Sequence, residues 1–329
     1  MAFKLIDAER GGLNGWVEAG LFVLAISALT VVYAIAQQAG AHIVVFILYA
    51  MGFAAIGMLA ITGLGQHPLK VALARESMVF GWSTVLLEAF YFLLLGFMTP
   101  AETSLSLRLS VPVSLIVGWL FFQREMTGRL WLGTALIVAA VVPILMGVED
   151  DARIVAGLLA LICSLVVAVK TFASEFHPAN RAARNLYDKL RVTGLVVLAT
   201  TLIGAAVVAP LVLLAAGGVV PQGSFIPPAV AFWHPPTLVT AIAIGAPVFV
   251  AMTYLTFSSV VKIGTESFLA TSAFTPFSVL AIEYLAAAFG LLTVGTFDMR
   301  LMPFIALGIV GVLIVVHARH HGGQSRESR

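Results

Sequence analysis

Two stretches of sequence decide the fold of this chain: Leu105-Ser106-Leu107-Arg108-Leu109-Ser110-Val111-Pro112 and Ala270-Thr271-Ser272-Ala273-Phe274-Thr275-Pro276. Each stretch belongs to an apolar segment that is long enough to cross a bilayer and carries a proline and several Ser and Thr residues near its middle. Backbone groups freed by such an interruption are tolerated in a membrane only where they line a cavity. Paired interrupted segments therefore indicate the binding site of a transporter, and we expect the substrate site there.

The composition places the chain in a membrane. Hydrophobic residues make up 60% of the 329 residues, charged residues only 10%, and the mean hydropathy is +1.05. Such a chain cannot cover a soluble domain with a polar surface. A net charge of +2 is too small to indicate a nucleic-acid partner. The single cysteine, Cys163, excludes an intramolecular disulfide and is expected to be a small buried hydrophobic residue.

Apolar runs of about 17 to 25 residues predict ten membrane-spanning helices. We expect them at 17–36, 41–62, 79–98, 101–123, 130–147, 153–174, 192–216, 237–260, 264–292 and 301–318. The first is expected to be an uncleaved helix and not a signal peptide. An even number of spans returns both termini to one side, and nearly all Lys and Arg residues between the spans fall on that side. The positive-inside rule then predicts that both termini are cytoplasmic.

Two connections between the spans are longer than tight turns. The stretch 175–191 connects the sixth and seventh spans and is basic, and its residues 185–190 are predicted to form a short amphipathic helix on the cytoplasmic surface. The stretch 217–236 is rich in proline and aromatic residues and has no basic residue. We expect it outside as an interfacial loop, with a lid or a partner contact as the alternative.

The third, fourth and ninth spans resemble the EamA repeat of the drug/metabolite transporter superfamily. The resemblance is carried by Glu88-Ala89-Phe90-Tyr91-Phe92, Gly118-Trp119-Leu120-Phe121-Phe122-Gln123-Arg124-Glu125 and Val261-Lys262-Ile263-Gly264-Thr265-Glu266-Ser267. In that family a mid-helix proline is followed about three and a half turns later by a glutamate at the cytoplasmic end, and Pro112 and Glu125 match. Phe289-Gly290 stands where the second repeat would carry its glutamate, which indicates a divergent branch.

The resemblance implies an all-α integral membrane fold of ten transmembrane helices. These helices would form two inverted five-helix repeats, 17–147 and 148–318, around a central cavity that opens alternately to either face. The repeats would be flanked by a cytoplasmic N-terminal segment, 1–16, and a cytoplasmic tail, 319–329.

Three charged residues are predicted within the spans at one depth: Glu88, Arg108 and Glu283. At 1.5 Å rise per residue, each would lie roughly 10–15 Å below the outer surface. A charge in lipid costs at least about 2.5–3.5 kcal/mol, so all three should face the interior and find partners.

Three interpretations of these charges stay open. Glu88 and Arg108 can form an ion pair that ties neighbouring helices. Glu283 can then be the unpaired carboxylate that binds a coupling proton or anchors a cationic substrate. Alternatively, Arg108 and a carboxylate grip the two ends of a zwitterion such as an amino acid.

The other candidate site residues are polar, aromatic or at the interruptions. They are Ser110 and Pro112 on the fourth span, Ser272, Thr275 and Pro276 on the ninth, Trp82 and Tyr91 beside Glu88 as aromatic walls for an organic cation, and Tyr254 with Thr253, Thr256 and Ser258 on the eighth. Lys170 is expected to extend from its span to the cytoplasmic surface.

Enzyme signatures such as a P-loop, HExxH or GxSxG are missing from the sequence, so we expect no enzyme, cofactor or metal. The sequence predicts a secondary transporter of the bacterial inner membrane that moves a small organic metabolite, such as an amino acid or amine, by alternating access. Export is favoured, and protons and membrane lipids are candidate partners of a monomer or homodimer. The alternatives are a lipid or lipid-linked-sugar flippase and a non-transporting membrane scaffold subunit.

Overall fold

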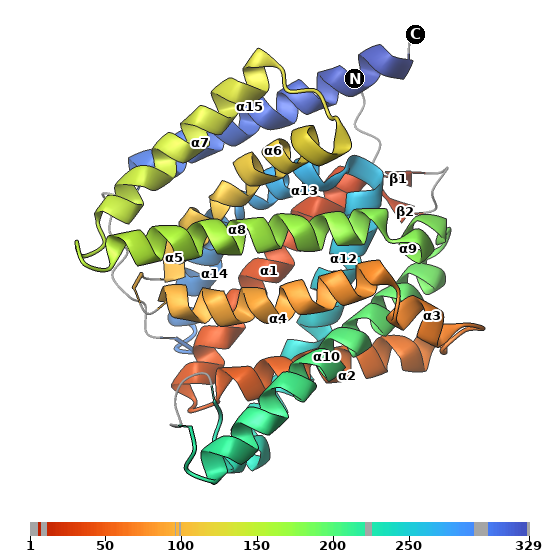
Figure 1. Ribbon diagram of the computed structural model, residues 1–329, viewed down its shortest axis with the longest axis vertical. Coiled ribbons are helices and arrows are strands. Elements are labelled where there is room, and N and C mark those ends of the chain that lie inside the picture. The colour runs from red at the N-terminus through yellow and green to blue at the C-terminus, as the bar shows by residue number, and fades with distance from the viewer. Residues whose placement is uncertain are drawn as a thin grey trace.

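The computed structural model describes residues 6–7, 12–95, 97–98, 100–220, 226–292 and 302–327. The described part of the chain is helical apart from one antiparallel pair of two-residue strands, β1 (Ile6–Asp7) and β2 (Gly12–Leu13) (Figure 1). Leu301, the first residue of the predicted tenth span, lies outside the described residues, as do residues 221–225 of the connection 217–236.

Eight long helices form most of the molecule. They are α1 (Gly15–Gln38), α2 (Ile43–Thr62), α4 (Arg75–Leu95), α7 (Gly128–Met146), α8 (Arg153–Phe176), α10 (Leu186–Ala216), α12 (Ala246–Ile263) and α15 (Met302–Glu327). The connecting turns include the short elements α3 (Pro68–Ala72), α9 (Pro178–Ala182), η2 (Ala229–Trp233), α11 (Pro235–Thr240) and the π-helical η3 (Ala241–Gly245).

Two further segments are interrupted near their middle, as expected from their prolines. The first consists of α5 (Pro100–Ser106), the 3₁₀ turn η1 (Leu107–Leu109) and α6 (Ser110–Phe122). The second consists of α13 (Thr265–Ser272) and α14 (Thr275–Ala288). Proline has no N–H, so Pro276 leaves the carbonyl of Ser272, four residues earlier, without its helical donor. The Thr275 hydroxyl donates to that carbonyl at 2.5 Å and closes the end of α13.

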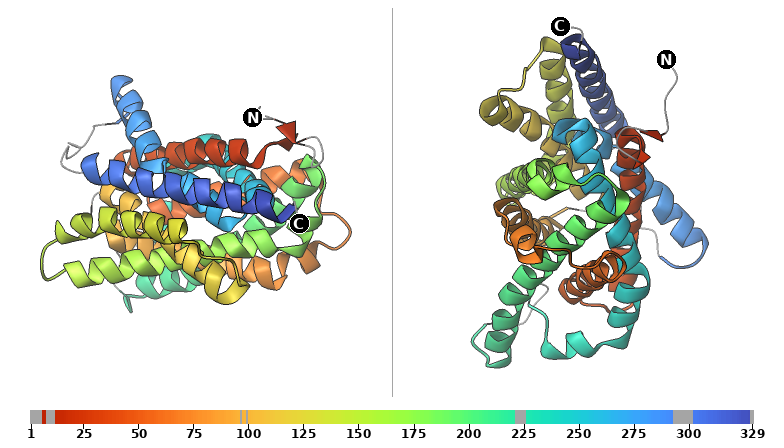
Figure 2. Two further views of the ribbon diagram at one scale, coloured as in Figure 1. Left: turned by 90° about the horizontal axis from the view of Figure 1, so that it is seen from above. Right: turned by 90° about the vertical axis from the view of Figure 1, so that its right-hand side faces the viewer.

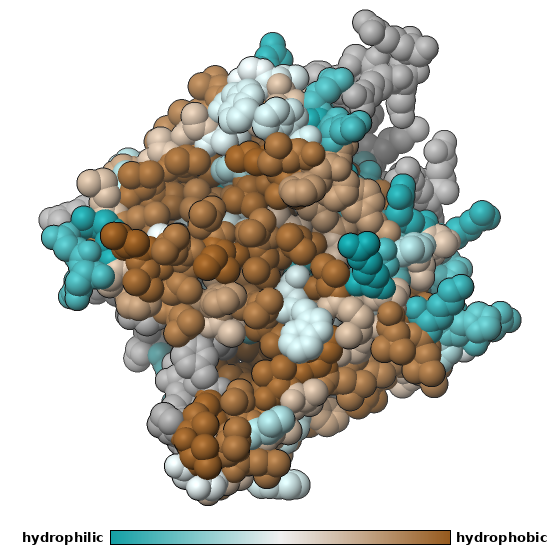
Figure 3. All heavy atoms as spheres, viewed as in Figure 1, coloured by the Kyte–Doolittle hydropathy of each residue, from teal (hydrophilic) through white to brown (hydrophobic). Residues whose placement is uncertain are grey.

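Within the described residues, nine helical segments are long and apolar enough to cross a membrane. Helix α4 has 21 residues, about 31 Å at 1.5 Å per residue, but is not one of these nine. Large apolar side chains point outward, with Ile154 74% and Leu202 61% exposed. Figure 3 shows a broad hydrophobic band with hydrophilic side chains at its left and right edges. The protein is therefore a multi-pass membrane protein whose band faces the acyl chains.

The first and last described elements lie on the same side of the bundle. Figures 1 and 2 place β1 and β2 on the side toward which the C-terminal end of α15 points, whereas the connection between α7 and α8 lies on the opposite side. We call the first the termini side and the second the far side. Gly264, with a φ of 80°, allows the sharp turn between α12 and α13 on the termini side.

The long helices pack in pairs. α7 packs against α15, α4 against α8, α1 against α12, and α2 against α10. The seam between α7 and α15 is tight because glycines face each other. A Cβ on Gly133 would lie 2.7 Å from the carbonyl oxygen of Gly311, and one on Gly311 would lie 2.8 Å from that of Gly133. Small residues at such a crossing let two membrane helices approach closely.

One local prediction was wrong. Residues 185–190 do not form a separate amphipathic helix, because Asn185 caps the start of α10 by accepting from the Asp188 N–H at 2.8 Å. The last helix, α15, extends beyond residue 318, the predicted end of the tenth span, to Glu327. In the connection 217–236, the Tyr49 hydroxyl donates to the Phe232 carbonyl at 2.8 Å, so this part of the connection packs against α2.

Candidate functional site

A cavity of about 210 Å³ lies between the helices in the middle of the bundle. Side chains from α1, α4, α5, η1, α6, α8, α12, α13 and α14 line it. The polar and charged ones are Thr30, Tyr33, Thr84, Glu88, Tyr91, Ser104, Arg108, Ser110, Lys170, Thr171, Thr253, Thr256, Ser272 and Thr275. Both interrupted segments thus contribute to one cavity.

The structure brings together eight of the residues that the sequence proposed for the site. They are Glu88, Tyr91, Arg108, Ser110, Thr253, Thr256, Ser272 and Thr275. The prolines Pro112 and Pro276 are buried within one turn of lining residues and act through the backbone. Both interruptions therefore lie at the cavity wall.

Four proposed residues, besides the two prolines, do not line the cavity: Trp82, Tyr254, Ser258 and Glu283. Trp82 is 49% exposed, on a different face of α4 from Glu88. Glu283 follows Ser272 by 11 residues, about 16 Å along the helix axis, which carries it beyond the cavity. The prediction of one common depth therefore did not place Glu283 in the cavity with Glu88 and Arg108.

Arg108 does not form the expected ion pair with Glu88. Its guanidinium donates to the Ser104 carbonyl at 3.1 Å, to the Ser104 hydroxyl at 3.3 Å and to the Ser272 carbonyl. The last of these is the carbonyl that Pro276 leaves without a helical donor. Arg108 therefore connects the interruption of one segment to that of the other, and we assign it a positioning role.

Lys170 lies in the cavity and does not extend to the surface as expected. Its ammonium nitrogen lies 5.1 Å from the centroid of the Phe80 ring, a cation–π distance. Among the described residues, no ion pair or hydrogen bond is made by the Lys170 ammonium or the Glu88 carboxylate. The cavity therefore offers a ligand one carboxylate and one ammonium group, because Arg108 is held by backbone carbonyls.

An ion-pair network connects several helix ends on the termini side of the bundle. Arg124, just after α6, donates to Glu175 at the end of α8 at 2.6 Å and to Glu266 at the start of α13. Arg319 on α15 pairs with Glu266 at 3.2 Å. The Glu175 carboxylate also accepts from the Thr265 N–H at 2.8 Å. The network therefore joins four helical segments.

The network lies a short way from the cavity. Glu175 follows the cavity-lining Thr171 by four residues, about 6 Å along α8, and Glu266 precedes Phe268 by two residues. The guanidinium of Arg124 also lies 5.4 Å from the centroid of the Phe172 ring. A Cβ on Gly118 would lie 2.2 Å from a carboxylate oxygen of Glu266, so only glycine leaves room for this pair. These contacts connect the ends of cavity-lining helices on the termini side.

A second buried ion pair joins α1 to α12 on the same side. The Lys262 ammonium lies 2.8 Å from the Glu18 carboxylate, and the two side chains are 5% and 1% exposed. The Ser258 hydroxyl donates to the same carboxylate oxygen at 2.9 Å. Buried charges are tolerated when they are paired and hydrogen-bonded in this way.

His177 forms a buried polar cluster between α8 and α9. Its Nδ1 accepts from the Asn180 N–H at 3.4 Å, and its Nε2 lies 2.9 Å from the Ser77 hydroxyl. The Asn180 amide donates to the Phe257 carbonyl at 2.8 Å. Burial lowers the pKa of His177, although the nearby Glu76 carboxylate and hydrogen bonds to backbone carbonyls oppose the shift. The lowered pKa and the N–H that Asn180 donates to Nδ1 agree with a neutral ring that carries its proton on Nε2.

We expect acid to destabilise the protein through His177. Because its pKa is lower in the folded than in the unfolded chain, the unfolded chain binds more protons as the pH falls below about 6.5, the ordinary value. Protonation of Nδ1 also removes the acceptor of the Asn180 N–H, at a cost of roughly 1–3 kcal/mol. The melting temperature of the wild type should fall between about pH 7 and pH 5, and that of His177→Asn should fall less. Equal slopes for both proteins would contradict this assignment.

A smaller apolar cavity of about 170 Å³ lies beside the central one, between α2, α4 and α10. Thr84 and Glu88 line both cavities. The remaining lining is almost wholly aliphatic, with Thr200 as one more polar side chain. The Glu88 carboxylate is therefore at the boundary between a polar and an apolar space.

Sequence reasoning missed several lining residues, chiefly Thr30, Tyr33, Thr84, Lys170 and Thr171. Thr30 and Tyr33, and Thr253 and Thr256, recur at a spacing of three, so each pair shares one helix face. On α12 this spacing indicated the lining residues correctly, because Thr253 and Thr256 were both candidates. No group of three or more His, Cys, Asp or Glu among the described residues is placed to hold a metal ion.

Comparisons with known proteins bear on the fold alone. No protein-family model matches the chain, and no curated protein matches it. The chain is similar to a solved structure described only as "Crystal structure of protein", with a TM-score of 0.54 and 18% identity over 93% of this chain and 97% of that one. A likeness that covers nearly all of both chains shows that this helical arrangement recurs in a solved protein.

Proposed function

We propose that the protein is a ten-helix secondary transporter of the drug/metabolite type, in which the central cavity binds a small organic solute. The single observation that carries the proposal is a cavity between two interrupted helical segments, lined by the Glu88 carboxylate and the Lys170 ammonium group. Neither group makes a hydrogen bond or a salt bridge among the described residues. Ionisable groups inside a membrane protein are costly, and they mark the path of a substrate or a proton.

The pairing of helices supports an inverted repeat with α4 as the tenth span. In such a repeat, the first five spans are α1, α2, α4, α5–α6 and α7, and they correspond in order to α8, α10, α12, α13–α14 and α15. Each contact between a helix of one repeat and a helix of the other should then occur twice. The contact of α1 with α12 has its counterpart in α8 with α4, and that of α2 with α12 in α10 with α4. α2 with α10 and α7 with α15 are then the contacts across the pseudo-twofold axis.

The same proposal includes the orientation and the direction of transport. Basic residues gather in the connections on the termini side, such as Lys70, Arg181 and Arg184, which supports cytoplasmic termini in a bacterial inner membrane. In this proposal the Arg124 network is the gate on this side, and its opening would admit a solute from the cytoplasm for export. Glu88 is the group that we propose to carry a coupling proton.

The size of the cavity supports a metabolite and not a bulky drug. A volume of about 210 Å³ equals roughly seven water molecules at about 30 Å³ each. Pockets for drug-sized ligands are larger, about 300–1,000 Å³. A carboxylate and an ammonium group on the wall favour a solute that carries an amine, a carboxylate or both.

We expect Glu88→Gln to weaken solute binding about ten- to hundredfold, because a hydrogen bond to a charged group is worth roughly 1.5–3 kcal/mol. The measurement is the thermal stabilisation of purified protein by amino acids, amines, nucleosides and organic cations at two pH values, followed by titration of the compounds that stabilise it. Glu283→Gln is the matched control, because it removes an equivalent intramembrane carboxylate outside the cavity. If a compound still raises the melting temperature of Glu88→Gln but no longer raises that of Glu283→Gln, the proposed site is contradicted.

A flippase for amphiphilic lipids is the second candidate, and the apolar cavity beside Glu88 favours it. A polar head group in the central cavity and an apolar chain between α2, α4 and α10 would use both spaces. Ala89→Phe would fill the apolar cavity, which Ala89 lines. If Ala89→Phe loses the binding of amphiphiles but keeps the binding of small solutes, the flippase is supported. If no compound stabilises the wild type, a scaffold subunit is favoured.

A further inference from the structure

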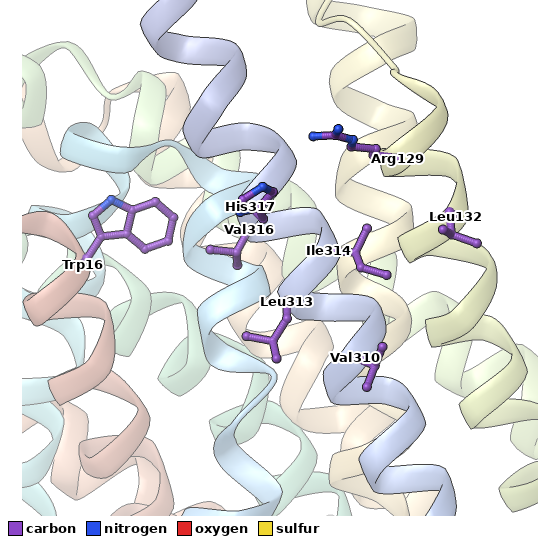
Figure 4. Close-up of a pocket in the computed structure, with 8 residues that line it drawn as sticks. All are labelled: Trp16, Arg129, Leu132, Val310, Leu313, Ile314, Val316 and His317. Carbon is purple, nitrogen blue, oxygen red and sulfur yellow. The ribbon is translucent and has the colours of Figure 1, made fainter. Parts of the chain in front are cut away.

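A groove on the outer surface of the bundle is separate from the central cavity. It has a volume of about 880 Å³ and lies between α1, α7 and α15 (Figure 4). Its lining residues are Trp16, Arg129, Leu132, Val310, Leu313, Ile314, Val316 and His317, and none of them lines the central cavity. The groove is therefore a candidate binding site separate from the central cavity.

The polar and apolar side chains of the groove are separated along its length. Arg129 lies in the first turn of α7 and His317 toward the end of α15, on the termini side. Figure 4 shows these two side chains in the upper part of the view, with Val310 at the opposite end of the groove and the Trp16 indole directed toward α15 from α1. Val310 precedes His317 by seven residues, about 10 Å along the helix axis.

The apolar part of the groove is open to the surroundings. Leu132 is 53%, Val310 49% and Leu313 51% exposed. Exposed aliphatic side chains are common to every lipid-facing surface and do not select one lipid over another. The groove differs from the rest of that surface because basic groups lie at one end.

Arg129 has donors to offer at that end. It is exposed, and no described residue accepts a hydrogen bond from its guanidinium or pairs with it. Guanidinium groups bind phosphate through two parallel N–H donors. Trp16 starts α1 at the level where indole rings prefer to lie, between the head groups and the acyl chains.

We propose that this groove binds one anionic phospholipid, with the phosphate held by Arg129 and His317 and an acyl chain along Leu132, Leu313 and Val310. Basic pockets between transmembrane helices select anionic head groups. A second copy of the chain is a poorer occupant, because an isologous contact would bring the two Arg129 side chains and the two His317 side chains together at one interface. The proposal rests on the membrane-spanning fold and does not depend on the transported solute.

Native mass spectrometry of the full-length protein in detergent tests the proposal with an equimolar mixture of phosphatidylglycerol and phosphatidylcholine. The wild type should retain phosphatidylglycerol in preference to phosphatidylcholine. Arg129→Gln should lower the retained phosphatidylglycerol about fivefold, the effect of one Lys or Arg near a head group. His317→Gln should lower it by a smaller factor, because it replaces a ring N–H donor and not a guanidinium. Arg75→Gln is the matched control, because Arg75 is an exposed arginine at the start of α4, away from the groove.

Three results would overturn the proposal. The first is equal retention of the two lipids by the wild type, and the second is unchanged retention of phosphatidylglycerol by Arg129→Gln. The third is a wild-type dimer without bound lipid that Arg129→Gln converts to a monomer, which would assign the groove to a second copy. A normal melting temperature of Arg129→Gln would show that the fold is intact, and normal stabilisation by a solute would separate this site from the central cavity.

Discussion

Arg124→Ala should destabilise the protein by roughly 3–5 kcal/mol, the typical cost of removing one partner from a buried ion pair. Arg124 is 22% exposed and serves two carboxylates, Glu175 and Glu266, whose side chains are 14% and 5% exposed. Without the guanidinium, Glu175 keeps the Thr265 N–H and Glu266 keeps Arg319, but neither keeps its full set of partners. Loss of the cation–π contacts with Phe122, Phe172 and Phe176 adds to the effect.

Urea titration of the protein in mixed micelles would measure this loss, with two matched variants. Arg124→Lys keeps the charge but cannot present a planar fork to two carboxylates, so it should recover only part of the stability. Asp188→Asn breaks the exposed Arg191–Asp188 pair, whose side chains are 33% and 40% exposed, and should cost at most about 1 kcal/mol. Equal losses for Arg124→Ala and Asp188→Asn would contradict the stabilising role of the Arg124 network.

Arg108→Ala should lower the stability of the protein and weaken the proposed binding of a solute. The Ser272 carbonyl loses a charged donor at the position where Pro276 supplies none, and the Ser104 carbonyl loses another. Hydrogen bonds to charged groups contribute roughly 1.5–3 kcal/mol each, although Thr275 still donates to Ser272. The two interrupted segments would then no longer be tied to each other across the cavity.

The melting temperature and the solute affinity together distinguish a positioning role from direct binding. A positioning residue predicts a lower melting temperature, with solute affinity partly restored in Arg108→Lys. A substrate ligand predicts an unchanged melting temperature and complete loss of affinity. Arg153→Ala is the control, because Arg153 on the far side donates to the carbonyls of Met146 and Val148 at 3.0 and 3.1 Å but lies outside the cavity.

Much of the fold could be predicted from hydropathy alone. Nine of the ten predicted spans coincide, within a few residues, with helical segments that are long and apolar enough to cross a membrane. This succeeds because backbone groups in lipid must be satisfied within the helix itself, so a long apolar run leaves few alternatives. The prolines at 112 and 276 marked the interrupted segments for the same reason, since a missing N–H is a local property of the chain.

The site was harder to predict because it depends on helix rotation. Glu88 and Arg108 reach the cavity, whereas Glu283 does not, although all three were expected at one depth. Lys170 was expected at the surface, yet the packing of α8 against α4 places it over Phe80. A position along an apolar helix gives the depth of a side chain, but only the neighbouring helices determine which face is internal.

The sequence by itself determined that this protein is helical and embedded in a membrane, and it located the two interruptions that border the cavity. Those properties follow from short-range chemistry: the transfer of apolar side chains to lipid and the missing N–H of proline. Only the tertiary structure decided that Arg108 binds the carbonyl freed by Pro276, that Lys170 and Glu88 line the same cavity, and that Arg124 joins Glu175 to Glu266. These contacts link residues 51 to 164 positions apart, and their formation depends on how separately stable helices pack against one another.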